Sequence, residues 1–221
     1  MFKIDNYKHL LAKEKEIFVL FLGFIVLFGG CVNLKQPAKM DEIAYYTLEY
    51  DPPALGNLQP LSIVIKVQPF SVAPIYGTNR IIYRDKSFKR AEYVYHKWRD
   101  NPGDLVPYFI SRDMRKSGLF RAVLPQDSGS RPSYVLEGSV EDFLEWDTED
   151  GWEAFLSVSV VLIMANEPGI GKRILFQKTY QDREPCKQKN PEALAEAMSQ
   201  AMSVASREII QDIYDYLKDQ R

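Results

Sequence analysis

The sequence predicts an α+β fold in which a mostly antiparallel sheet carries two helices packed on one face. Three observations lead to this fold class. Several segments alternate with the two-residue period of strands, two segments repeat apolar residues at helical spacing, and their order is strands, helix, strands, helix. The 221 residues are 46% hydrophobic and 26% charged, enough for one sizeable core. The formal net charge of −2 is spread along the chain, so no electrostatic footprint for nucleic acid is present.

Aromatic and β-branched residues predict four short strands before the first helix. These strands are expected over residues 45–50, 62–68, 80–84 and 92–96. In the second strand, Ile63, Ile65 and Val67 fall on one face. A loop rich in proline and glycine separates the first two strands.

The first helix is expected just after the turn residues 101–104, with Asp104 as its N-cap. Pro107 would then lie in the first turn, where a missing N–H costs little, and Gly118 would end the helix. The residues at helical spacing are Leu105, Phe109, Ile110 and Met114. A strand over residues 120–124 follows.

Three further strands are predicted as a meander over residues 134–146, 152–164 and 174–180. Asp142 and Phe143 break the alternation of the first strand, which indicates a bulge. Residues 148–151 are typical of a hairpin turn, and the strand after it has apolar side chains at every even position.

The last element is predicted to be a long helix capped by Asn190, with Pro191 at its first position. One apolar stripe runs along it, formed by Leu194, Met198, Met202, Ala205, Ile209, Ile213 and Leu217. Its alanines would let the helix lie close against a sheet.

The N-terminus is typical of a secretory signal, because four lysines precede the apolar run 17–28 and small residues follow it. The run is about a dozen residues long, shorter than the roughly 20 of a spanning helix. If the run is extended to Leu34, a permanent anchor helix is the alternative. We expect a signal peptide over 1–30, a tether over 31–44 and a folded domain over 45–221.

Cys31 follows Gly29 and Gly30 and resembles the acylation site of bacterial lipoproteins. The pattern prefers leucine three residues earlier, where this chain has Phe28. The resemblance implies cleavage before Cys31, attachment of a diacylglyceryl group and an N-acyl chain such as palmitate, and, because Val32 follows, sorting to the outer membrane. Cys186 would remain as an unpaired thiol, tolerable in an oxidising compartment if it is buried or slow to react.

Candidate catalytic and metal-binding residues are few. His96 is the only histidine outside the predicted signal, and no motif supplies it with a nucleophile, so a structural role is favoured. Residues 169–172 lack the spacing of a phosphate loop and are interpreted as a turn. An acidic cluster, interpreted as a solvated hairpin end, comprises Glu141, Asp142, Glu145, Asp147, Glu149 and Asp150. We predict no metal and no cofactor other than the covalent lipid, since Cys186 has no companion for zinc.

Several aromatic side chains are candidates either for a groove that holds acyl chains or a peptide, or for the core: Tyr45, Tyr46, Tyr83, Tyr93, Tyr95 and Trp98. The apolar loop 72–76 would be a contact patch if it is exposed. The candidate contact residues for a partner or lipid are Val72, Pro74, Ile75, Tyr76 and Trp98.

The order of these segments resembles the ABC-type transport auxiliary lipoprotein component family. The resemblance rests on residues 45–48, on the strand 63–67 leading into the loop 72–76, on residues 81–84 and on the segment 93–98, and it extends over 31–217. It implies an outer-membrane lipoprotein on the periplasmic face, beside an inner-membrane ABC transporter and a mammalian-cell-entry (MCE) domain protein. It also implies apolar cargo such as phospholipid. The family has no catalytic residues, so the resemblance assigns a role to Cys31 alone, as the site of acylation.

Two other functions stay open. One is a structural envelope lipoprotein that assists lipopolysaccharide or peptidoglycan assembly, and the other is a hydrolase that uses His96 or the acidic cluster. A homo-oligomer is a further open candidate.

Overall fold

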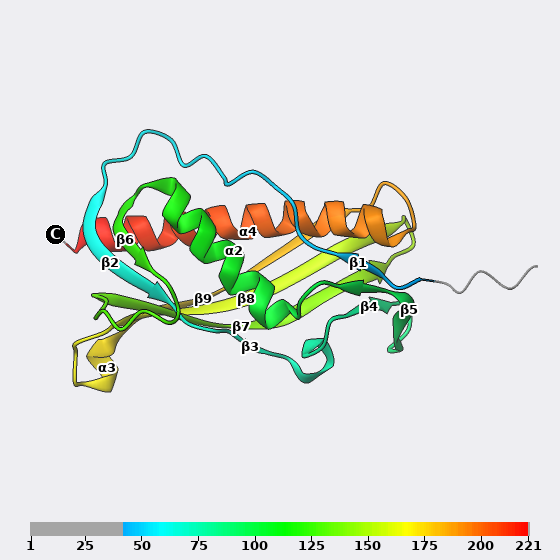
Figure 1. The fold of residues 1–221 in the computed structure, drawn as a ribbon, viewed down its shortest axis with the longest axis horizontal. Coiled ribbons are helices and arrows are strands. Elements are labelled where there is room, and N and C mark those ends of the chain that lie inside the picture. Colours follow the sequence, from blue (N-terminus) through cyan, green and yellow to red (C-terminus); the bar gives the residue numbers. More distant parts are fainter. Residues whose placement is uncertain (1–41, 221) are drawn as a thin grey trace, which may run out of the picture. The chain divides into compact units, whose positions relative to one another are not determined.

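The computed structural model describes residues 42–220, which lie in one compact unit beginning at Glu42 (Figure 1). The predicted signal, Cys31 and the tether as far as Asp41 lie outside the described residues. The elements in chain order are β1 (Ala44–Tyr46), β2 (Leu61–Val67), β3 (Ser71–Val72), the 3-10 helix η1 (Pro74–Tyr76), β4 (Arg80–Arg84), β5 (Arg90–Trp98), α2 (Pro102–Ser117), β6 (Phe120–Leu124), β7 (Tyr134–Asp147), β8 (Trp152–Met164), α3 (Ile170–Arg173), β9 (Ile174–Pro185) and α4 (Pro191–Asp219). Within residues 42–220, no helix has the length and apolar character needed to span a bilayer.

The strand β7 is the central member of a nine-stranded sheet. Along one edge it pairs antiparallel with β8, from Tyr134↔Met164 to Asp147↔Trp152, and β9 continues this meander. Along its other edge β7 pairs in succession with β2, β3 and β4, each parallel to it. The sheet is therefore mixed, whereas the sequence predicts a mostly antiparallel one. Hydrophobic alternation shows which face of a strand is buried, but it does not identify the neighbouring strand.

Helices α2 and α4 contact each other and pack against the sheet, α4 over β8 and β9, and α2 over β2, β6 and β7 (Figure 1). The even-numbered residues 154–162 of β8 are completely buried, as their alternation predicts. The Asn190 side chain accepts a hydrogen bond from the Ala193 N–H at 2.8 Å, which confirms the predicted cap of α4. The alanines Ala195, Ala201 and Ala205 of α4 are buried.

Several predicted elements have different bounds in the structure; β9, for example, continues to Pro185 rather than ending at Tyr180. Helix α2 begins at Pro102 with Asn101 as its N-cap, not at Asp104, so Pro107 lies inside the helix rather than in its first turn. The first strand covers only Ala44–Tyr46. The predicted αL cap at Gly118 is confirmed, with φ of 67°.

The bulge in β7 is also confirmed, because the register with β8 shifts between Val140 and Asp142. Just before it, β7 contains Gly138, where the ring of Phe70 packs directly against the backbone. A Cβ at this position would lie 2.6 Å from Phe70 and 2.7 Å from the Ser159 carbonyl oxygen, so only glycine fits without a shift.

Candidate functional site

The loop expected to be a contact patch is anchored at one end and exposed at its middle. The Tyr76 ring is buried, and its hydroxyl donates to Asp142 Oδ1 at 3.1 Å. Burial, together with Asp142, raises the pKa of Tyr76 to about 12. Val72 is half-buried in the short strand β3, whereas Pro74 and Ile75 are exposed. Only the Pro74–Ile75 tip of this loop is therefore available to a partner.

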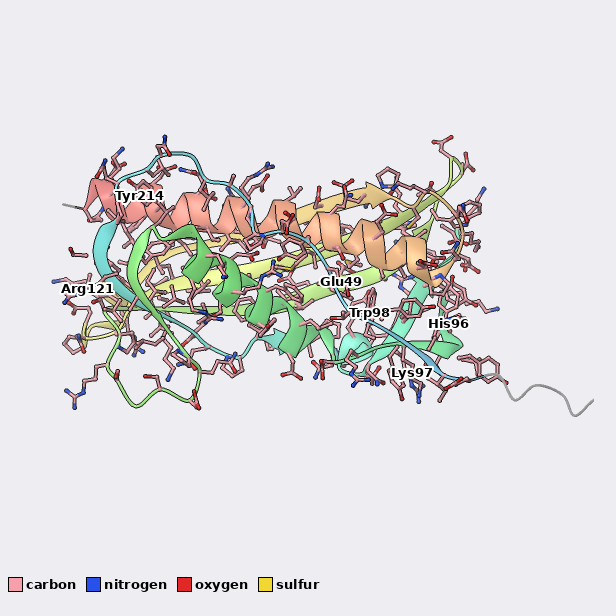
Figure 2. All side chains as sticks on the ribbon, turned by 45° about the horizontal axis from the view of Figure 1, so that its top comes forward. Glu49, His96, Lys97, Trp98, Arg121 and Tyr214 are labelled. Carbon is pink, nitrogen blue, oxygen red and sulfur yellow. The ribbon has the colours of Figure 1, made fainter. Side chains whose placement is uncertain are left out.

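Trp98 is a core residue in this structure. Its side chain is 1% exposed and packs edge-on against Phe143, with ring centroids 5.1 Å apart (Figure 2). Trp98 therefore positions β5 against β7, and direct contact with a partner would require the core to open.

The environment of His96 is aromatic. The Tyr46 hydroxyl and His96 Nδ1 share a hydrogen bond of 3.0 Å, and the Tyr93 ring meets the imidazole edge-on. Within residues 42–220, no serine, threonine, cysteine or carboxylate is hydrogen-bonded to His96. The contacts of this histidine join β1 to β5, which is a structural role.

The acidic cluster divides into an exposed part and a buried part. Glu149 and Asp150 are exposed in the turn between β7 and β8, as expected of a solvated hairpin end. Glu145 instead is 1% exposed, and the Tyr93 hydroxyl donates to its two carboxylate oxygens at 3.1 and 2.9 Å. The prediction of a solvated carboxylate is therefore wrong at Glu145.

Burial is the main cause that raises the pKa of Glu145 to about 7. The hydrogen bond from Tyr93 opposes this shift, and the neighbouring Asp147 carboxylate reinforces it. Lys189 pairs with Asp147 at 2.5 Å on the solvent side of the group. Among the described residues, no three His, Cys, Asp or Glu side chains are arranged to hold a metal ion.

Cys186 lies half-buried beside this group. Burial first, and then the negative charge of Glu145, raise the pKa of the Cys186 thiol to about 12. Because the thiolate is the reactive form, this cysteine meets the condition that an unpaired thiol in an oxidising compartment be slow to react.

A second buried polar group was not anticipated from the sequence. Asp113 of α2 accepts hydrogen bonds from the Tyr50 hydroxyl at 2.8 Å and the Ser206 hydroxyl at 2.7 Å, and it pairs with Arg112 at 2.7 Å. These bonds join the segment after β1 to both long helices. Burial raises the pKa of Tyr50, and the Asp113 carboxylate adds to the shift.

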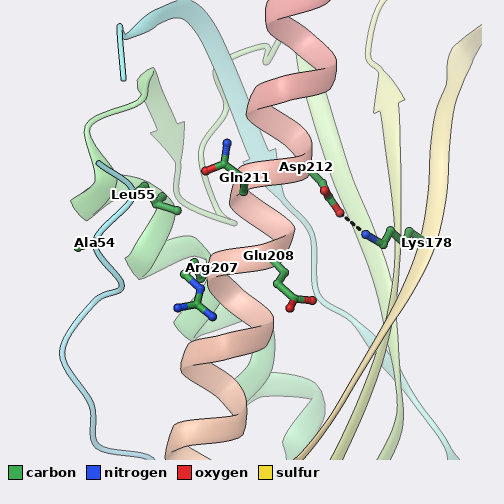
Figure 3. A pocket seen from close by; sticks show the side chains of 7 residues that line it. All are labelled: Ala54, Leu55, Lys178, Arg207, Glu208, Gln211 and Asp212. Carbon is green, nitrogen blue, oxygen red and sulfur yellow. Dashed lines mark hydrogen bonds and ion pairs between the residues drawn. The ribbon is translucent and has the colours of Figure 1, made fainter. Parts of the chain in front are cut away.

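A hollow beside α4 has a volume of about 550 Å³ (Figure 3). Its lining residues are Ala54, Leu55, Lys178, Arg207, Glu208, Gln211 and Asp212. Asp212 pairs with Lys178 at 2.6 Å and accepts a hydrogen bond from the Tyr180 hydroxyl at 2.6 Å. A hollow lined mainly by charged side chains does not fit an acyl chain, whose pocket would be predominantly apolar.

The polar groups described above mainly join one element of the fold to another. The family model for the ABC-type transport auxiliary lipoprotein component matches residues 46–210, and the chain belongs to this family. Its class is therefore that of an auxiliary lipoprotein component of ABC-type transport. No curated protein matches the chain.

Two solved structures show the same fold. The chain is similar to the protein XCC0632 from Xanthomonas campestris, with 20% identity, a TM-score of 0.68, and coverage of 80% of this chain and 98% of that one. It is also similar to an uncharacterized protein, with 13% identity, a TM-score of 0.61, and coverage of 78% and 99% respectively.

Proposed function

We propose that this chain is an outer-membrane lipoprotein of the periplasm and the auxiliary component of an MCE-type ABC transport system that moves lipids or other apolar molecules across the envelope. Its own role is docking: it holds the periplasmic end of the assembly at the membrane. The family membership carries this proposal, because it makes the chain an auxiliary lipoprotein of an ABC transporter. The proposed arrangement is a signal peptide over 1–30, an acylated tether over 31–44 and the docking domain over 45–221.

The anchor in this proposal is the lipid on Cys31. Each buried methylene contributes about 0.8 kcal/mol, and stable anchoring requires more than one acyl chain. A diacylglyceryl group plus an N-acyl chain meets this requirement. Val32, which follows Cys31, supports outer-membrane rather than inner-membrane retention.

The exposed tip Pro74–Ile75 is the part of the predicted contact loop that supports docking, since Tyr76 beside it is anchored to β7 through Asp142. Anchoring of a loop before binding lowers the conformational entropy that binding costs.

The experiment that tests the whole proposal is purification of the native protein from host membranes in mild detergent, followed by mass spectrometry of what accompanies it. We expect an MCE-domain protein and an acyl mass on Cys31. Recovery of lipopolysaccharide or cell-wall machinery instead would replace the transport role with a structural role in envelope assembly.

The anchor is tested separately by Cys31→Ala. We expect a folded protein that is lost from the outer-membrane fraction, because the site of acylation is gone. Cys186→Ser is the matched control and should leave the distribution unchanged. Normal outer-membrane retention of Cys31→Ala would refute the lipoprotein assignment.

A further inference from the structure

Large apolar side chains are exposed unevenly over the described residues. Eight of them are exposed, and five of the eight belong to β1, to β5 and to the segments directly before these strands. These five form what we call the edge patch: Ile43, Tyr45, Phe88, Val94 and Tyr95. The other three are dispersed over the η1 loop, α2 and the start of β9: Ile75, Tyr108 and Ile174.

The edge patch arises from an irregularity in β5. Arg80 of β4 pairs with Lys97, but Ile82 pairs with Glu92, so β5 has three more residues than β4 over this stretch. The extra residues bulge, and the successive residues Val94 and Tyr95 are 69% and 45% exposed. In a regular strand, one of two successive side chains would face the core.

The outer edge of β5 is also incompletely covered. The edge strand β1 pairs only with the end of β5, from Ala44↔His96 to Tyr46↔Trp98. No described strand pairs with the outer edge of β5 before His96. Beyond this edge, the turn between β4 and β5 presents Phe88, whose side chain is 97% exposed. An exposed edge with apolar side chains requires a covering surface in a stable envelope protein.

The chain itself indicates what that surface is. Cys31 lies eleven residues before Glu42, where the described structure begins. Two residues of the edge patch, Ile43 and Tyr45, lie directly after Glu42 in the chain. Eleven residues span at most about 36–40 Å when fully extended. An acyl group on Cys31 therefore keeps this end of the domain within about 40 Å of the bilayer, a distance at which β1 can reach its surface. Figure 1 shows that β1 and the turn between β4 and β5 lie at the same end of the domain.

The chemistry of the edge patch also suits a lipid surface. Tyrosine favours the interface between headgroups and acyl chains, because its apolar ring and its polar hydroxyl are both accommodated there. Phenylalanine is typical of the apolar face of segments that lie in this interface. The basic residues Lys86, Lys89 and Arg90 accompany Phe88 in the turn. The acidic residues Asp147, Glu149 and Asp150 line the same hollow as Lys86, so the apolar side chains rather than a net positive charge carry the contact.

We propose that the edge patch lies on the phospholipid surface into which the acyl chains of Cys31 insert. The two contacts together fix the orientation of the domain, so that the opposite end, formed by β6, α3 and the end of α4, points away from the bilayer (Figure 1). The proposal depends on the proposed function only for the presence of a lipid on Cys31.

The test supplies that lipid chemically, so that it does not depend on acylation in the cell. The chain 31–221 with Cys186→Ser is coupled through Cys31 to maleimide-phosphatidylethanolamine in vesicles of phosphatidylethanolamine and phosphatidylglycerol that contain a photoactivatable phospholipid. This chain includes every described residue, and these form one compact unit. After illumination, mass spectrometry maps the lipid adducts along the sequence.

We expect most adducts within residues 42–46 and 85–95. The triple variant Phe88→Ser, Val94→Ser, Tyr95→Ser should lower the adduct yield by at least about threefold, since its apolar contact is lost. The matched control Ile75→Ser, Tyr108→Ser, Ile174→Ser should leave the yield unchanged. All six positions are exposed, and thermal melts of both variants verify the fold.

An even distribution of adducts over the surface would overturn the proposal, as would an equal loss in the control variant. Self-association of the tethered chain through the edge patch, without lipid adducts, would overturn it by identifying the patch as a protein interface. If the proposed function is wrong, the native protein purified from host membranes will carry no acyl mass on Cys31. That result does not depend on the vesicle experiment.

Discussion

Replacement of Glu145 by glutamine should stabilise the protein at neutral and alkaline pH. The carboxyl group is buried, and its negative charge at high pH is unfavourable beside Asp147. Glutamine has nearly the same shape and no charge. Its carbonyl oxygen can still accept the hydrogen bond from Tyr93, and its amide can donate to Asp147.

The size of the stabilisation by Glu145→Gln follows from the pKa of Glu145 in the folded protein. In the folded protein the pKa of Glu145 is raised to about 7 from its ordinary value of 4.5. Each unit corresponds to about 1.4 kcal/mol, so the shift amounts to about 3 kcal/mol. Because the folded-state pKa is the higher one, the folded state binds the proton more tightly. The stabilising contribution is complete below the unfolded pKa and is lost as the pH rises through about 7.

Thermal unfolding followed by circular dichroism between about pH 4 and pH 8 measures this effect. The wild-type protein should lose stability over that range. Glu145→Gln should match it at about pH 4 and exceed it by up to about 3 kcal/mol at about pH 8, or about 6–12 °C in Tm. Glu137→Gln, at an exposed position of the same strand, is the control and should follow the wild type. If Glu145→Gln shows the same pH dependence as the wild type, the buried carboxyl is not the source of the effect and the reasoning fails.

Three further predictions concern packing and reactivity. Asp113→Ala should lower the free energy of unfolding by about 3 kcal/mol in urea titrations, because three donors lose a buried acceptor; a loss below about 1 kcal/mol would show that the network is not important for stability. Gly138→Ala should cost about 1–3 kcal/mol through its clash with Phe70, while Gly129→Ala, with open space around it, should be nearly neutral; equal effects would contradict this account. The Cys186 thiol should react with a maleimide at about pH 8 roughly a thousandfold more slowly than an ordinary cysteine, since its thiolate is that much rarer. Reaction at an ordinary rate in the folded state would refute this prediction.

The features that the sequence predicts correctly are local ones. The Asn190 cap, the αL glycine at position 118, the bulge in β7 and the alternation of β8 each depend on a few neighbouring residues. The parallel pairing of β2, β3 and β4 with β7 depends on residues far apart in the chain. A two-residue period does not encode this pairing.

The buried polar group at Glu145 illustrates the same limit. In sequence, Glu145 is one of six acidic residues near a turn. Its burial depends on the bulge in β7, after which Phe143 and Glu145 alternate toward the core, and on Tyr93, which β5 brings to it. After the bulge Phe143 faces the core, and with a two-residue period Glu145 faces the core as well. This alternation is the sequence signal that could have identified Glu145 as buried.

The position of β7 in the sheet also sets the time at which the chain can fold. β2 pairs with β6 and β7, and Ile65 is joined to Tyr134, almost seventy residues later. Such long loops must close before the strands can pair, and their closure costs conformational entropy. These contacts therefore form late in folding. Because synthesis begins at the N-terminus, β2, β3 and β4 are without their β7 partner until β7 itself has been made. Completion of the central sheet is therefore deferred to the second half of the chain, in which β7, β8 and β9 lie.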